Sequence, residues 1–125
     1  MKSNKRGLAR IVAALFYSFD GIRSSFKYEE AFRQEVYLFI LLLPVLYFVP
    51  VSPQFKAILF AGNCLVLIVE LLNSAVESVV DLVSPDYNIL AKRAKDMGSA
   101  AVLLSIILAG ALWLAAVLSF FDSIA

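Results

Sequence analysis

Histidine is absent from the 125-residue chain, and cysteine occurs once, at Cys64 inside an apolar run. Without histidine, one chain has no imidazole base, no Ser-His catalytic triad and no His-ligated zinc site. A single cysteine excludes an intrachain disulfide and a cluster of thiolate metal ligands. Acid–base chemistry in this protein would therefore depend on carboxylates or lysine.

The motifs of the common kinase folds are also missing. The sequence contains no GxxxxGK[ST] phosphate loop, no GxGxxG segment and neither the HRD nor the DFG set of protein kinases. A kinase built from this chain would therefore use a different fold.

Apolar residues, in contrast, dominate the composition. Hydrophobic residues make up 62% of the chain and the mean hydropathy is +0.86, whereas soluble domains contain roughly 45–50% apolar residues. Three membrane helices of about 20 residues each would occupy half of the chain and leave no room for a separate soluble catalytic domain. We therefore expect one membrane domain over residues 1–125, with any chemistry built on its helices.

The pattern of apolar and charged residues divides the chain into four helices. After a basic tail at 1–6, apolar residues recur every three or four positions among charged ones, which is typical of an amphipathic helix in the membrane interface. Packing of this helix on the others is the open alternative. Proline residues end the first span, and Ser84-Pro85-Asp86 has the pattern of a helix N-cap. We predict an all-α membrane protein with a surface helix at 7–27 and transmembrane helices at 31–49, 54–83 and 85–121.

Basic residues predict the orientation of these helices. Ten of the eleven Lys and Arg residues precede the first span or lie between the second and third spans, and Lys56 alone lies on the other side. Because basic residues concentrate on the cytoplasmic side of membrane proteins, we expect a cytoplasmic N-terminus and a C-terminus outside.

The second span carries a stripe of polar residues. In CLVLIVELLNSAVESVVD, at 64–81, the polar residues Glu70, Asn73, Glu77 and Asp81 are 3, 4 and 4 positions apart. At about 100° per residue they share roughly one quadrant of the helix. A charged residue at membrane depth costs about 2.5–3.5 kcal/mol and usually marks a functional site.

The same membrane face is predicted to hold further charged residues. Carboxylate and amide oxygens suit Mg²⁺ that also binds substrate phosphates, lysine binds phosphates as a point charge, and Glu70 is placed to act as a base on a hydroxyl at headgroup depth. These residue types predict phosphoryl transfer to a lipid. An ion-conducting subunit and a structural assembly held by polar helix contacts remain as alternatives. The additional residues are Glu29, Lys92, Arg93, Lys95 and Asp96.

Four blocks of sequence resemble the small integral-membrane diacylglycerol kinases of bacteria: RIVAALFYSFDGIRSSF, EEAFRQE, VELLNSAVESVVD and AKRAKDMGSAAV. The resemblance implies a homotrimer in the inner membrane, with a periplasmic C-terminus and active sites shared between neighbouring subunits. It also implies transfer of the γ-phosphoryl group of MgATP to diacylglycerol, which gives phosphatidic acid.

The resemblance assigns roles to residues of this chain. Glu70 would be the general base, and Glu29 and Glu77 would bind Mg²⁺. It leaves Asp81 without a role, so we rank Asp81 below the other stripe residues. The nucleotide and phosphate site would comprise Arg10, Tyr17, Asn73, Glu77, Tyr87, Asn88, Lys95 and Asp96. The lipid substrate would contact Arg10, Ser18, Glu35, Glu70 and Ser99.

A few positions depart from the pattern of the Gram-negative diacylglycerol kinases. Asn88 stands where that branch often has histidine, Lys92 where it has glycine, Leu82 in place of arginine and Ala13 in place of lysine. A lysine at this position is similar to the pattern of the branch of the family that phosphorylates undecaprenol. Undecaprenol therefore remains the alternative acceptor.

Overall fold

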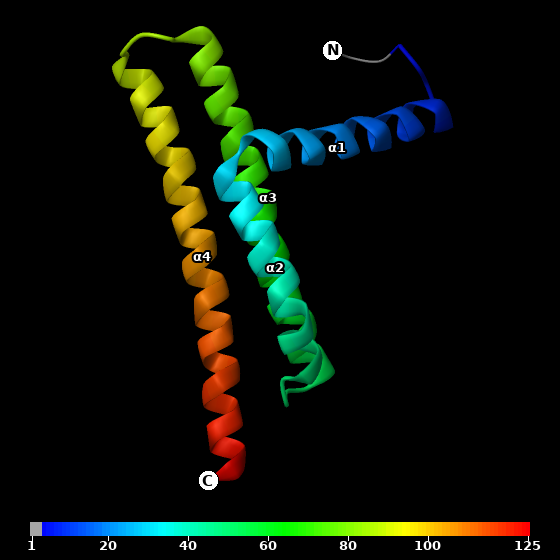
Figure 1. The fold of residues 1–125 in the computed structure, drawn as a ribbon, viewed down its shortest axis with the longest axis vertical. Helices are drawn as coiled ribbons and strands as arrows, with labels where there is room; N and C mark the ends of the chain where they lie inside the picture. The colour runs from blue at the N-terminus through cyan, green and yellow to red at the C-terminus, as the bar shows by residue number, and fades with distance from the viewer. Residues whose placement is uncertain (1–3) are drawn as a thin grey trace.

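The computed structural model describes residues 4–125, and that part of the chain forms four helices and no strand (Figure 1). The first three residues of the predicted basic tail lie outside the described residues. The helices are α1 (Leu8–Tyr28), α2 (Glu30–Phe48), α3 (Pro53–Val83) and α4 (Ile89–Ile124).

Three of these helices, α2, α3 and α4, are long and apolar enough to cross a membrane. This confirms the predicted all-α membrane fold. Helix α1 runs crosswise to the other three (Figure 1) and contacts α2 and α3 but not α4. Only Ala13 and Ser25 of α1 are buried, which is the arrangement expected of a helix that lies along a membrane surface.

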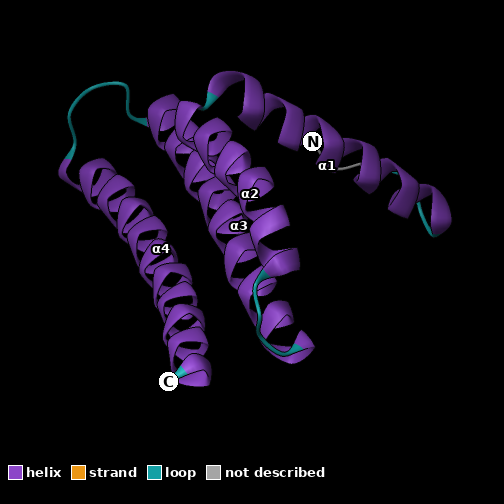
Figure 2. Ribbon diagram, turned by 60° about the horizontal axis from the view of Figure 1, so that its bottom comes forward, coloured by secondary structure: helices purple, strands orange, loops and turns teal. Residues whose placement is uncertain are grey.

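Helix α3 lies between α2 and α4 and contacts all three other helices (Figure 2). The apolar core, formed by Leu46, Leu59 and Ala116, lies where α2 turns into α3. Farther along, Trp113 Nε1 of α4 donates a hydrogen bond of 3.0 Å to Asn63 Oδ1 of α3. Apolar packing thus joins the helices at one end, and the acidic residues of α3 lie toward the other.

The predicted start of the last helix was wrong. Ser84 does not cap α4, because its Oγ donates a hydrogen bond to the carbonyl oxygen of Asp86 within the loop. The N-cap is Asn88, whose Oδ1 accepts hydrogen bonds from the backbone N–H groups of Leu90 and Ala91 at 2.8 and 3.3 Å. One asparagine oxygen therefore satisfies two of the unpaired N–H groups at the helix start, and α4 begins at Ile89 and continues to Ile124.

Candidate active site

The backbone of Glu29 forms the junction between α1 and α2. Its extended backbone serves as the C-cap of α1 and the N-cap of α2. Its N–H donates to the carbonyl oxygen of Ser25 at 2.9 Å, and its own carbonyl accepts from Arg33 N at 3.1 Å. Arg33 Nη1 also donates to the carbonyl oxygens of Phe26 and Lys27, which favours this position because a cation stabilises a helix C-terminus.

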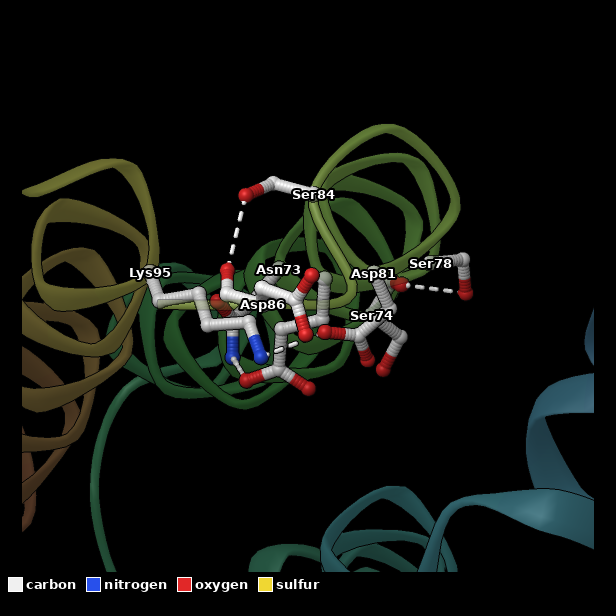
Figure 3. A network of polar contacts seen from close by, with 8 residues as sticks. Asn73, Ser74, Ser78, Asp81, Ser84, Asp86 and Lys95 are labelled. Carbon is white, nitrogen blue, oxygen red and sulfur yellow. Dashed lines mark hydrogen bonds and ion pairs between the residues drawn. The ribbon is translucent and has the colours of Figure 1, made fainter. Parts of the chain in front are cut away.

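A cavity of about 520 Å³ lies between the second half of α1 and residues 71–78 of α3. Glu29 and Ser18 line it from the α1 side, and Ser74 and Ser78 line it from α3. The prediction did not include Ser74 and Ser78, although their spacing of four residues places both on one side of a helix. In Figure 3, Ser78 Oγ donates to the carbonyl oxygen of Ser74 at 2.9 Å.

The structure gathers four of the predicted carboxylates into one region. Glu70 is only 6% exposed, and the charges of Glu35, Glu77 and Glu29 all repel it. Within residues 4–125, no ion pair joins any of these four to a basic side chain. We call Glu29, Glu35, Glu70 and Glu77 the acid cluster, and such a set of like charges attracts a cation.

Asn73 links the acid cluster to α4. Its Nδ2 donates a hydrogen bond of 3.3 Å to Glu77 Oε1. Its Oδ1 is buried without a hydrogen-bond partner and lies against Gly98 of α4. In the described part of the chain, no group of three or more His, Cys, Asp or Glu residues is arranged to hold a metal ion. A metal bound by two of these carboxylates would therefore need further ligands from a substrate or another chain.

The ends of α3 and α4 that meet at their connecting loop carry paired charges. Lys95 Nζ reaches across from α4 to Asp81 Oδ1 of α3 at 2.5 Å (Figure 3). Lys92 Nζ contacts Asp96 Oδ2 at 2.6 Å on α4. These four residues, which we call the charge-paired region, line a cavity of about 410 Å³ together with Tyr87 and Asn88.

Two contacts at this end involve residues that the sequence analysis discussed. Asp81, which we ranked below the other stripe residues, contacts Lys95, a predicted phosphate-binding residue. Asn88 remains a predicted nucleotide ligand, but its Oδ1 already accepts the two hydrogen bonds that cap α4.

The remaining predicted residues do not line the cavity beside the charge-paired region. Arg10 lines a separate surface hollow on α1 with Ser18, and Tyr17 is exposed on the same helix. Ser99 is exposed on α4. The cavity at the α3–α4 loop contains no α1 residue. One chain therefore presents the predicted nucleotide residues on two separate surfaces.

Comparison with known proteins gives a consistent family. The family model described as prokaryotic diacylglycerol kinase matches residues 16–117. The diacylglycerol kinase of Escherichia coli K12 is 43% identical over 90% of this chain and 93% of its own length. That of Pseudomonas aeruginosa is 46% identical over 86% of this chain and 87% of its own, and that of Helicobacter pylori is 36% identical over 86% and 84%.

Proposed function

The chain belongs to the prokaryotic diacylglycerol kinase family and is a membrane-integral diacylglycerol kinase, and from that premise we propose that its acid cluster directs phosphoryl transfer from MgATP to the lipid hydroxyl. The observation that carries the proposal is the gathering of three carboxylates around the buried Glu70, with no ion pair to any of the four within residues 4–125. Because like charges repel, this arrangement favours a bound cation and a proton acceptor in the same region.

Glu70 is the proposed general base. It is the buried member of the acid cluster and lies on a helix long enough to span the membrane, so it can meet a hydroxyl held at headgroup depth. The lipid oxygen attacks the γ-phosphorus of ATP and forms the new P–O bond. The bond from the γ-phosphorus to the oxygen that bridges the β- and γ-phosphates breaks, ADP leaves, and Glu70 takes the hydroxyl proton.

Glu29 and Glu77 are the proposed Mg²⁺ ligands. Both side chains are half-buried, and the negative charge of each repels the carboxylate of Glu70. Hard carboxylate oxygens suit Mg²⁺. Bound Mg²⁺ would neutralise charge on the β- and γ-phosphates. The hydrogen bond from Asn73 to Glu77 restricts the carboxylate and leaves its other oxygen available for the metal.

The charge-paired region is the proposed phosphate and nucleotide end of the site. Lys95 would exchange Asp81 for the phosphates of ATP, while Asp96, Tyr87 and Asn88 surround the same cavity. We assign Arg10 and Tyr17 to the nucleotide of a neighbouring subunit, because they lie on α1 and do not line this cavity. A homotrimer with shared active sites would bring the two surfaces together.

The lipid would enter from the bilayer beside α1 and α2. Ser18 lines the cavity that also contains Glu29, and Glu35 lies near enough to Glu70 to repel its charge. We propose Arg10, Ser18, Glu35, Glu70 and Ser99 as the residues that contact the lipid. The proposed location of this single-domain protein is the inner membrane, with a cytoplasmic N-terminus and a periplasmic C-terminus.

The experiment is a product assay with purified protein in mixed micelles. We expect ³²P from the γ-position of ATP to appear in phosphatidic acid when diacylglycerol and Mg²⁺ are present, and to disappear when EDTA replaces Mg²⁺. Undecaprenol serves as the matched acceptor in parallel reactions. Preferred labelling of undecaprenol would overturn the proposed acceptor, and labelling that persists in EDTA would overturn the role of the metal.

A further inference from the structure

Gly98 faces α3 in a space that leaves no room for a side chain. The three heavy atoms nearest to the position where a Cβ would stand are Oδ1, Cγ and Cβ of Asn73, and the first of them is too close for any real Cβ. Gly98 lies three residues after Lys95, so it belongs to the turn of α4 that also reaches the charge-paired region. A larger residue at 98 would fit only if the Asn73 side chain moved.

Hydrogen bonding fixes which way round the Asn73 amide must lie. A carboxylate only accepts hydrogen bonds, so the NH₂ group of Asn73 must face Glu77 Oε1. The carbonyl oxygen must then face Gly98, where it is buried with no N–H or O–H donor. A glycine presents a Cα–H group along the direction of a missing Cβ, and such groups make weak contacts with oxygen. Gly98 therefore leaves the space that the Asn73 amide occupies, and its Cα–H group is the neighbour of the amide oxygen.

We propose that Gly98 is a positioning residue that acts through Asn73: its missing side chain lets the amide lie against α4 and hold Glu77 in the orientation needed for MgATP. The proposal rests on the proposed function, which places Asn73 and Glu77 in the nucleotide and metal site. Among residues 4–125, the other glycines do not share this contact. Gly7, Gly21 and Gly110 have open space at the Cβ position, and the nearest neighbour of Gly62 is the flexible end of Leu112.

The test compares Gly98→Ala with Gly110→Ala, which makes the same change in the same helix where nothing lies within 4 Å of the new Cβ. Isothermal titration of the micellar protein with Mg²⁺ and β,γ-methylene-ATP measures nucleotide affinity without turnover. Because small misplacements of a binding group are costly, we expect Gly98→Ala to weaken this affinity by about 10-fold or more. The thermal unfolding temperature and the KM for diacylglycerol should stay near the wild-type values, and Gly110→Ala should bind the nucleotide as the wild type does.

A third variant, Asn73→Ala, separates failure of this proposal from failure of the proposed function. If Asn73→Ala loses affinity while Gly98→Ala does not, the role of Gly98 is overturned and the proposed site stands. If both variants keep wild-type affinity, Asn73 lies outside the nucleotide site. That result would overturn both the role of Gly98 and the proposed role of Asn73.

The double variant Asn73→Ala/Gly98→Ala tests whether the effect passes through Asn73. Residues that act on one contact are not additive, so the double variant should bind no more weakly than Asn73→Ala, and a further loss would overturn the proposal. Should Gly98→Ala fail to fold, removal of the Asn73 amide should restore folding in the double variant. A double variant that also fails to fold would show that the contact with Asn73 is not the cause.

Discussion

The acid cluster and the charge-paired region differ in how their charges are balanced. The charges of Glu29, Glu35 and Glu77 all repel the buried Glu70, whereas Asp81 and Asp96 each contact a lysine. The side chains of the paired residues are 44–64% exposed, and exposed ion pairs add little to stability. In the proposed function, the acid cluster binds the cation of MgATP, and the weak ion pairs of the charge-paired region exchange their partners for its phosphates.

The largest effect is expected at Glu70, the buried member of the acid cluster. Glu70→Gln removes the proposed base and keeps nearly the same shape, so kcat should fall by about 10²–10⁴-fold. Steady-state assays measure kcat, and size-exclusion chromatography in detergent measures assembly. Glu30→Gln is the matched control, because Glu30 is an exposed acid at the start of α2 whose Oε1 accepts a hydrogen bond of 3.3 Å from Gln34. Disassembly of Glu70→Gln would instead assign Glu70 to helix packing.

The next largest effect should be a shift in metal requirement. Glu77→Gln replaces one proposed Mg²⁺ ligand by an amide, so the Mg²⁺ concentration that gives half-maximal activity should rise by at least about 10-fold, the lower end of losses seen around metal sites. Titrating Mg²⁺ at saturating ATP measures this change. An unchanged requirement would remove Glu77 from the metal site and weaken the contrast between the two regions.

Asp81 tests whether the charge-paired region releases its lysine easily. Asp81→Asn removes the charge that Lys95 contacts and so frees the lysine for the proposed phosphate site. Because an exposed pair is weak, we expect the KM for MgATP to fall by about 2- to 5-fold with kcat almost unchanged. Lys95→Met, in contrast, should raise this KM. If Asp81→Asn raises the KM as Lys95→Met does, Asp81 is itself a ligand in the nucleotide site.

The smallest effect is expected at Lys92. Its contact with Asp96 lies on the exposed surface of one helix, and pairs of this kind contribute little. Lys92→Ala should therefore change the KM for MgATP by less than about 2-fold, as measured in the same assays. A change as large as that of Lys95→Met would show that Lys92 binds phosphate directly.

The sequence predicted the features that depend on spacing within one helix. Hydropathy located the three spans and the surface helix, and the spacing of Glu70, Asn73 and Glu77 placed these residues together on one side of α3. The Lys92–Asp96 contact could also have been read from its spacing of four residues. In each of these cases, the pattern along a single helix determines the result.

Contacts between helices could not be predicted in this way. Whether Lys95 meets Asp81, Trp113 meets Asn63 or Gly98 meets Asn73 depends on how α4 is rotated and shifted along α3, and periodicity does not fix that relation. The predicted start of α4 was wrong for a local reason. Serine and asparagine are both favoured at helix N-caps, and the geometry of the loop decides that Asn88 rather than Ser84 caps α4.

The central claim is that the acid cluster binds the metal of MgATP, and the most direct measurement is Mg²⁺ affinity at saturating β,γ-methylene-ATP. Isothermal titration would compare the wild type with Glu29→Gln/Glu77→Gln, and Glu30→Gln would serve as the control. We predict that the double variant loses at least about 10-fold in Mg²⁺ affinity while the control does not. Equal affinity in the wild type and the double variant would contradict the account.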